Sequence, residues 1–417
     1  MHDTPVLERK LVATIRVVLC CMLFAVVTAA VATASTAHEY YGKPYLTWQG
    51  CPSTTMTINF HTQQLLESVA VVYGPKSDGE TLEHRAEGVS RQIPGLADGR
   101  HVHSVELTGL EAGQTYCFRI ELPEGLSPAY TFRTIPEGSE PLRFAIGGDA
   151  LATPIFEGLV KHVAKQEPLF LVIGGDLAYA NGNVKQIGRW DLWFAAWHKY
   201  GTTPEGRLIP LVMAIGNHET NGLEGTNEAR APFYFGFFPQ GGKTFFSRQF
   251  GANLGMIVLD SGHVAKHETQ VEFLEKHLKS FSQLPFRVAV YHVPLYPSHR
   301  PYGGKASAAG RTHWLPLFDA HGLAIGFEHH DHTFKRTKRL KNNELNPEGT
   351  LYVGDGSAGV VSRKPEKGRW YMEKTSSKSH VWIVDVRADE IHLAAMSRKG
   401  EIFDEATVEA AAVVVAE

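Results

Sequence analysis

Cysteine is scarce in this 417-residue sequence. Only four copies occur, and Cys20 and Cys21 lie within an apolar N-terminal stretch. The other two, Cys51 and Cys117, could pair in an oxidising compartment, but the sequence leaves open whether their geometry allows a disulfide. No thiolate takes part in the candidate metal site described below, whose ligands are all oxygen or nitrogen donors.

Net charge is also nearly absent. The 41 basic residues are offset by 44 acidic residues, which leaves a formal charge of -3. Such a balance provides no overall field for holding nucleic acid or anionic lipid, so we expect no nucleic-acid partner. Any affinity for an anion must come from a local site. The oligomeric state does not follow from these features.

The N-terminus has the pattern of an export signal. Basic residues up to Arg16 precede the apolar run VVLCCMLFAVVTAAVA, and the small residues ATASTA follow it. This pattern predicts a signal peptide over residues 1–37, with Ser35 or His38 as the first residue of a secreted or periplasmic protein. The alternative is an uncleaved membrane anchor, because the run approaches the roughly 20 residues that span a bilayer.

The next segment, residues 41–135, is typical of a β-sandwich. Short alternating runs such as TMTINFHT, SVAVVYG and YCFRIEL are separated by turn-rich stretches. The stretch LTGLEAGQTYCFRI resembles the corner of a fibronectin type III domain, with Tyr116 as its core tyrosine. PEGSEP then indicates a short linker.

From residue 141 to about 400, strands alternate with helices, as in α/β folds. LRFAIGGD, LFLVIGGD, LVMAIGNHE and FRVAVYHVP are apolar runs, as expected for parallel strands with helices on both faces. Thr153 can cap a helix that starts at Pro154, and QVEFLEKHLKSF predicts another. GTLYVGDG, HVWIVDV and EIHLAAM predict later strands, and we interpret residues 401–417 as a tail.

Polar residues follow several of these apolar strands directly. Asp149, Asp176, Asn217 and His292 each stand at the carboxyl end of one strand, where open α/β sheets place their ligand sites. His330 and His332 end the apolar stretch LAIGF and have the spacing of one side of an extended chain. We therefore expect five strand ends to meet at one rim.

The residue types in this group suit two hard or borderline cations. Carboxylate, amide oxygen, phenolate and imidazole are all oxygen or nitrogen ligands. Two cations about 3.5 to 4 Å apart need a bridging group, and a carboxylate with two oxygens can supply it. The residues alone leave open whether Asp149 or Asp176 is the bridge.

These motifs resemble those of the purple acid phosphatases, within the calcineurin-like metallophosphoesterases. That family has GDxG, GDxxY, GNH with an acidic residue, VxxH and GHxH after a fibronectin-like domain. This sequence has GDAL at Gly148, GDLAY at Gly175, GNHE at Gly216, AVYH ending at His292, and HHDH at His329. The resemblance covers nearly all of the chain after the N-terminal signal.

The resemblance implies a complete ligand set for two metal ions. It assigns to a ferric ion the side chains of Asp149, Tyr179 and His332. It assigns to a divalent partner, Zn²⁺, Mn²⁺ or Fe²⁺, the side chains of Asn217, His292 and His330. Asp176 would bridge the two ions, and the tyrosine of GDLAY would give the iron its colour.

Four further histidines are notable, as are two positions at which the family has glycine and this sequence does not. The resemblance implies that His218 stabilises the substrate's phosphoryl oxygens and that His299, on a Gly- and Pro-rich loop, protonates the leaving group. Leu151 and His329 replace two glycines of the family's motifs, which leaves the ligands in place but alters the surrounding backbone. His263 and His329 could line the pocket, but a surface position is the favoured expectation for both.

Together these features predict an acid phosphatase that hydrolyses phosphomonoesters by in-line attack of hydroxide held by two metal ions. One alternative is a phosphodiesterase or nucleotide pyrophosphatase with the same metals, because the pocket walls decide between them. Another is a metal-containing binding or adhesion protein without turnover. The expected partner is a small phosphate ester.

Overall fold

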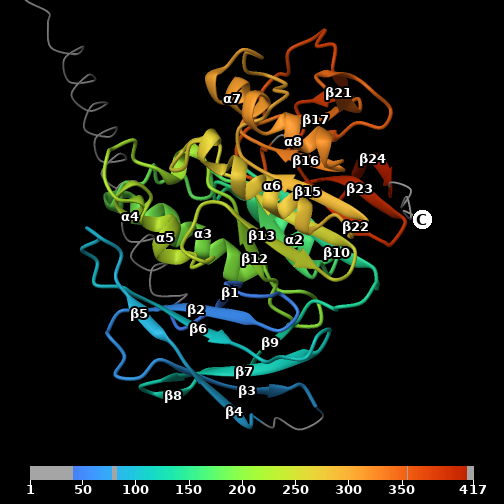
Figure 1. Cartoon of the computed structure of the whole chain (residues 1–417). Coiled ribbons are helices and arrows are strands. Elements are labelled where there is room, and N and C mark those ends of the chain that lie inside the picture. The colour runs from blue at the N-terminus through green and yellow to red at the C-terminus, as the bar shows by residue number, and fades with distance from the viewer. Residues whose placement is uncertain (1–40, 78–81, 355, 411–417) are drawn as a thin grey trace, which may run out of the picture.

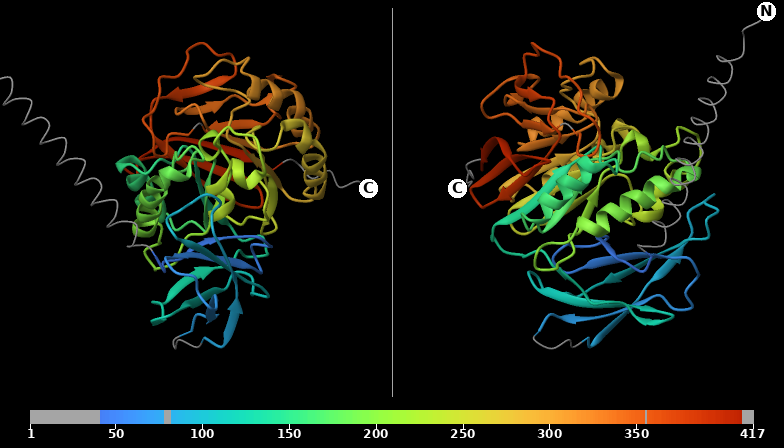
Figure 2. Two further views of the ribbon diagram at one scale, coloured as in Figure 1. Left: turned by 90° about the vertical axis from the view of Figure 1, so that its left-hand side faces the viewer. Right: turned by 180° about the vertical axis from the view of Figure 1, so that it is seen from behind.

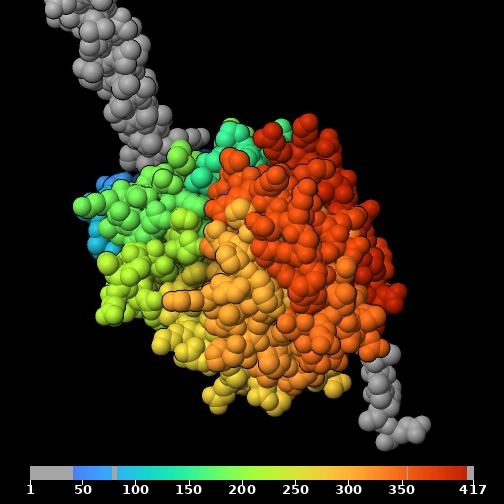
Figure 3. Space-filling model, turned by 90° about the horizontal axis from the view of Figure 1, so that it is seen from above, coloured from blue at the N-terminus to red at the C-terminus, as the bar shows by residue number. Residues whose placement is uncertain are grey.

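A computed structural model describes residues 41–77, 82–354 and 356–410. The chain folds into an all-β sandwich followed by an α/β unit with a β-sheet core, as the sequence predicts (Figure 1). All views place the sandwich on one side of the α/β unit (Figure 2). From above, segments coloured orange to red cover much of the visible face and the sandwich shows only at its edge (Figure 3).

The sandwich consists of two antiparallel sheets. One has the order β1-β2-β6-β5, with the bounds Tyr45–Thr47, Met56–Thr62, His101–Leu107 and Val89–Arg91. The other has the order β4-β3-β7, with β8 and β9 also paired to β7, and the bounds His84–Glu87, Ala70–Pro75, Thr115–Leu122, Gly125–Leu126 and Tyr130–Arg133. Ile58, Val105 and Phe118 are among the fully buried side chains that fill the space between them.

The structure tests two sequence inferences about the sandwich, and only the tyrosine corner is present. Tyr116 is buried in β7, and its hydroxyl accepts the backbone N–H of Glu111 at 2.8 Å, which is the geometry of a tyrosine corner. The possible disulfide does not form in this structure. Cys51 is exposed, whereas Cys117 is buried in β7, and neither belongs to a disulfide.

The α/β unit contains two large sheets. The six-stranded sheet has the order β12-β11-β10-β22-β23-β24, with the bounds Leu211–Met213, Phe170–Ile173, Leu142–Gly147, His380–Val386, Glu390–Ser397 and Ile402–Glu409. The seven-stranded sheet has the order β13-β14-β15-β16-β20-β17-β21, with the bounds Phe246–Phe250, Leu254–Val258, Phe286–Val290, Ile325–Glu328, Leu351–Gly354, Phe334–Thr337 and Met372–Ser376. β18 and β19 form a hairpin over Leu340–Lys341 and Glu344–Leu345.

The two sheets pack against each other, which the sequence interpretation missed. Alternate side chains of β10 and β11, such as Phe144 and Val172, share one core cluster with Val288 and Phe327 of the other sheet. Each sheet therefore has helices on one face only, rather than on both. Continuous apolar strands arise in either arrangement, because a second sheet buries a face as fully as a layer of helices does.

Helices cover the two outer faces. α2, α3 and α5 pack on the six-stranded sheet, α6 and α8 pack on the seven-stranded sheet, and α7 lies against α8. Their bounds are Pro154–Ala164, Ile187–Tyr200, Pro232–Phe237, Val271–Ser280, Lys305–His313 and Leu315–Ala320. The short α4 and three 3₁₀ turns, η1 to η3, span Asn227–Arg230, Val184–Gln186, Asn217–Glu219 and His267–Gln270.

Both helices singled out in the sequence are present. The Thr153 hydroxyl accepts the N–H of Ile155 and caps α2, whose first residue is Pro154, as predicted. The interpretation of residues 401–417 as a tail is wrong for β24, which pairs antiparallel with β23 and closes the six-stranded sheet. β24 is an edge strand with three acidic residues, Asp404, Glu405 and Glu409, and no continuous apolar run, which hides its role.

The predicted signal peptide lies outside the described residues. Within the part that the structure describes, no helix combines the length and apolar character needed to cross a bilayer.

One buried histidine of the sandwich makes stability depend on pH. His103 on β6 is fully buried, and its ring nitrogens contact the hydroxyls of Thr62 and Ser90 at 2.6 and 2.7 Å. Burial, followed by the charge of nearby His101, lowers the pKa of His103 to about 4. An unfolded histidine has a pKa of about 6.5, so between these values the unfolded chain binds the extra proton.

We therefore expect His103 alone to reduce the free energy of unfolding by about 2 kcal/mol between pH 7 and pH 5. Urea denaturation at both pH values measures this loss. His103→Gln should shrink the difference, whereas His101→Gln, a partly exposed position on the same strand, should change it much less, because burial is the larger cause of the shift. Equal pH dependence in His103→Gln and the wild type would show that His103 does not cause the effect.

Candidate metal centre

The predicted site residues lie where the strands of both sheets end. Asp149 follows β10, Asp176 follows β11, and Asn217 opens η2 after β12. His292 follows β15, and the stretch with His330 and His332 follows β16. The sequence predicts a single rim, but the structure builds the site from the carboxyl ends of two facing sheets. The facing arrangement brings residues far apart in sequence together.

One group of donor atoms gathers around Asp149. The Tyr179 hydroxyl donates to Asp149 Oδ1 at 3.0 Å, and His332 Nε2 lies 2.9 Å from the same oxygen. The Tyr179 oxygen and His332 Nε2 are 3.2 Å apart. These three side chains are buried and converge on one point.

A second group gathers around His292. Its Nε2 lies 3.2 Å from Asn217 Oδ1, 3.1 Å from His330 Nδ1 and 3.1 Å from Asp176 Oδ2. The other ring nitrogen of His292 faces the carbonyl of Gly174 at 2.9 Å, which fixes the orientation of the ring. This arrangement is typical of a metal-binding histidine, whose second nitrogen is held by a neighbouring acceptor.

Asp176 belongs to both groups. One set of ligand atoms, from Asp176, His292 and His330, lies within 4.8 Å of one another, and so does a second set from Asp149, Asp176 and His332. Asp176 Oδ2 is buried and makes no hydrogen bond, despite its close contact with His292. A buried, unpaired carboxylate oxygen between two such sets fits a bridge between two cations.

The backbone at the site is strained. Positive φ angles of 57°, 54° and 58° occur at Asp149, Asp176 and Tyr179, and of 75° and 58° at His330 and His332. Non-glycine residues in this region cost of the order of 1–3 kcal/mol each and cluster at functional sites. Five of the seven predicted ligands thus sit in conformations that only the surrounding structure maintains.

Electrostatic shifts agree with the geometry. Burial alone would lower the pKa of His292, but the adjacent Asp176 carboxylate raises it to about 10. Burial opposes charge on Asp149, yet the contact with His332 holds the pKa of Asp149 well below its usual range. Burial and the charges of Asp149 and Asp176 raise the pKa of Tyr179 far above 10, so a phenolate there requires a nearby cation.

Glu219 supports the backbone of the site. Its carboxylate accepts the N–H groups of Asp176 and Gly216 at 2.7 Å and of Leu177 at 2.8 Å. Burial, with a contribution from Asp176, raises the pKa of Glu219 to about 7. Glu219 belongs to neither donor group, so its role here is to hold the backbone of the ligand residues.

His218 lies beside the first donor group. Its backbone N–H donates to Asp176 Oδ1 at 2.7 Å, and its ring lies 4.1 Å from the Tyr179 ring, centre to centre. The Nδ1 atom contacts Asn181 Oδ1, and Nε2 is 3.9 Å from Asp176 Oδ2. Asn181 is not among the residues identified from the sequence. In the structure it lies just after GDLAY and has a positive φ of 53°, as several of the predicted ligands do.

His299 lies on the loop after β15, in neither donor group. Its Nδ1 faces the Lys364 carbonyl at 2.8 Å. Asp331 fixes this loop, because its Oδ2 accepts the backbone N–H groups of Ser298 and His299 at 2.7 Å and of Arg300 at 3.2 Å. Asp331 stands between His330 and His332, so one carboxylate joins the His299 loop to the ligand stretch. The sequence reasoning missed this role.

The expectation of a surface position for His329 is wrong. Its side chain is buried between Gly148 of the first motif and Gly174, the residue before the second motif: a Cβ added to Gly148 or Gly174 would lie 2.5 or 1.9 Å from the ring. His263 is partly buried, and its ring lies 5.6 Å from that of His292. Glycine at both strand ends makes room for the His329 imidazole. The two GGD stretches therefore indicate the buried position of His329, but this cannot be inferred without the fold.

Two family models match this chain. The model described as "Purple acid Phosphatase, N-terminal domain" matches residues 42–134, and that described as "Calcineurin-like phosphoesterase" matches residues 152–342. The two matches follow the division between the sandwich and the α/β unit.

Several plant proteins are similar to this chain. Purple acid phosphatase 15 of Arabidopsis thaliana is 28% identical over 61% of this chain and 53% of its own length. The match thus spans about half of that relative. Probable purple acid phosphatase 20 of the same plant is 25% identical over 75% of this chain and 73% of its own length. The solved structure of purple acid phosphatase PPD1 from yellow lupin has the same fold, with a TM-score of 0.73, 19% identity and coverage of 88% and 74%.

Proposed function

Because the chain belongs to the purple acid phosphatase family of calcineurin-like phosphoesterases, we propose that it hydrolyses phosphomonoesters with two bound metal ions. The observation that carries the proposal is the pair of donor groups that share Asp176. The buried Oδ2 atom of Asp176 has no hydrogen-bond partner, and the ligand atoms of each group lie close enough together to surround a cation. A small phosphate ester is the substrate under this proposal.

The ligand types divide the two positions chemically. Asp149, Tyr179 and His332 would hold a ferric ion, because carboxylate and phenolate favour a hard, highly charged cation. Asn217, His292 and His330 would hold a divalent ion, Zn²⁺, Mn²⁺ or Fe²⁺. When bound, the two ions would lower the pKa of water and neutralise charge on the phosphoryl oxygens.

His218 would contact the substrate's phosphoryl group. Asn181 holds its Nδ1, and the Tyr179 ring supports one face, so Nε2 is the nitrogen that remains to meet a ligand. A fixed donor at this position stabilises charge that develops on the phosphoryl oxygens.

His299 would protonate the leaving alkoxide. The Lys364 carbonyl takes up Nδ1, and Asp331 fixes the backbone of the loop through three N–H groups. Nε2 is then the atom that would transfer the proton.

Export of the protein is also part of the proposal. It rests on the basic, apolar and small-residue order of residues 1–37 and implies a secreted or periplasmic enzyme.

Initial rates on matched substrates test this function. We expect the metal-loaded protein to hydrolyse 4-nitrophenyl phosphate faster than bis(4-nitrophenyl) phosphate, because both release the same leaving group and differ in the second ester. His218→Asn should slow the monoester reaction by about 10²-fold, as loss of a fixed charge-stabilising donor does. Faster cleavage of the diester would favour the phosphodiesterase alternative, and no turnover of either would favour a binding protein.

A further inference from the structure

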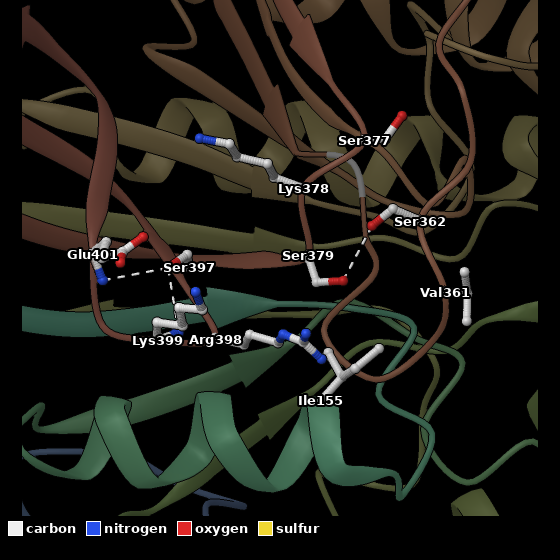
Figure 4. Close-up of a pocket in the computed structure, with 10 residues that line it drawn as sticks. All are labelled: Ile155, Val361, Ser362, Ser377, Lys378, Ser379, Ser397, Arg398, Lys399 and Glu401. Atoms are coloured by element: carbon white, nitrogen blue, oxygen red, sulfur yellow. Dashed lines mark hydrogen bonds between the residues drawn. The ribbon is translucent and has the colours of Figure 1, made fainter.

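A pocket of about 500 Å³ lies between the start of α2, the loop after β20 and the turn that joins β23 to β24 (Figure 4). Four serines contribute to its lining, together with the side chains of Ile155 and Val361. A smaller cavity of about 350 Å³ adjoins it and shares Ile155, Val361 and Arg398. The size is within the range of small-molecule sites, which is roughly 300–1,000 Å³.

The charge of this pocket is positive. Lys378, Arg398 and Lys399 line it, whereas Glu401 is its one acidic lining residue. The Lys378 ammonium group also lies over the Phe403 ring, 4.5 Å from its centre. Arg398 and Lys399 are exposed, and neither forms an ion pair within the described residues. Two cations next to each other on a turn are therefore available to an anion.

Hydroxyl groups add hydrogen-bond donors. Ser397 Oγ accepts the backbone N–H groups of Lys399 and Glu401, both at 3.3 Å, so its own proton remains for another acceptor. Ser362 Oγ and Ser379 Oγ are 3.1 Å apart (Figure 4). One of these hydroxyls donates to the other, which leaves one proton of the pair for a ligand.

Another part of the lining is apolar. Val361 is 80% exposed, which is unusual for a large aliphatic side chain, and it faces the pocket with Ile155. An inorganic ion would leave this wall in contact with water. A ligand with an anionic group and an apolar group would use both walls.

We propose that this pocket is a second ligand site, separate from the metal centre, that binds a small organic phosphate. The phosphoryl group would lie against Arg398, Lys399 and the serine hydroxyls, and the organic group against Ile155 and Val361.

The chain itself separates the two sites. The Gly359 N–H donates to the Asp149 carbonyl at 2.8 Å, and the Arg363 N–H donates to the His332 carbonyl at 2.7 Å. Between these two anchors, Val361 and Ser362 line the pocket. The loop thus has its backbone fixed to metal-centre residues and its side chains in the pocket, so one ligand molecule in each site is sterically compatible.

Calorimetric titration with phenylphosphonate tests the proposal, because its carbon–phosphorus bond is not a phosphate ester. We expect two binding events in the metal-loaded protein. Arg398→Ala/Lys399→Ala should weaken one event at least tenfold, a change of about 1.4 kcal/mol, and Asp176→Asn should leave that event intact. Val361→Ser should weaken phenylphosphonate binding several-fold but leave inorganic phosphate binding unchanged, because only the apolar wall is altered.

Lys243→Ala/Lys276→Ala is the matched control, since it removes two exposed cations that do not line the pocket. It should bind like the wild type. A single event that Asp176→Asn abolishes, or equal weakening in both double variants, would overturn the second site. An Arg398-dependent event in a protein without turnover would instead refute the phosphatase function while supporting the pocket.

Discussion

Asp176→Asn should remove both metal ions and reduce phosphomonoester hydrolysis by about 10³-fold or more. Asp176 Oδ2 is buried, belongs to both donor groups and makes no hydrogen bond. An amide at this position has no charge and presents at most one oxygen, so it cannot bridge two cations. A 10³-fold loss corresponds to about 4 kcal/mol of transition-state stabilisation, which is within what a pair of cations supplies.

Metal content and kcat/KM of the purified variant measure this effect together. Asp176 Oδ1 also accepts the His218 N–H at 2.7 Å, and the side-chain oxygen of asparagine can keep that bond, so the fold should survive. Asp385→Asn is the control, because it removes a carboxylate that pairs with Arg143 at the sheet surface. Full metal occupancy with near-normal turnover in Asp176→Asn would exclude Asp176 as the bridge.

Tyr179→Phe should abolish the visible absorption band of the protein. The proposed iron ligand set includes the Tyr179 oxygen, 3.0 Å from Asp149 Oδ1 and 3.2 Å from His332 Nε2. A tyrosinate bound to ferric iron gives a charge-transfer colour, and phenylalanine cannot form that bond. The substitution keeps the aromatic ring that contacts His218 and leaves the Asp176 bridge, so some turnover should persist.

Tyr234→Phe provides the comparison, since it removes another buried hydroxyl, one that donates to the Met213 carbonyl. Its visible spectrum should match the wild type. If both variants kept the visible band of the wild type, Tyr179 would be a core residue and the iron assignment would fail.

That the side chains of the metal centre lie close together could be predicted from the sequence, because each motif begins where an apolar strand ends. Asp149, Asp176 and His292 follow the carboxyl ends of buried strands, which is where α/β folds place their ligand sites, although these strands belong to two sheets. The period-two spacing of His330 and His332 does not describe their backbone. Both have positive φ, and they belong to different donor groups.

The facing sheets could not be predicted, because burial by a sheet and burial by helices leave the same apolar runs. The role of Asp331 was hidden for a different reason. Its partners are backbone N–H groups of residues 298–300, and no side-chain pattern records them. β24 was mistaken for a tail because only Asp404 and Val408 among its side chains are buried.

Metal analysis of the purified wild-type protein, combined with its visible spectrum, tests the central claim most directly. The account predicts two metal ions per chain, one of them iron, and an absorption band from the iron–tyrosinate bond. One ion per chain at saturation, or two ions without iron and without the band, would contradict it.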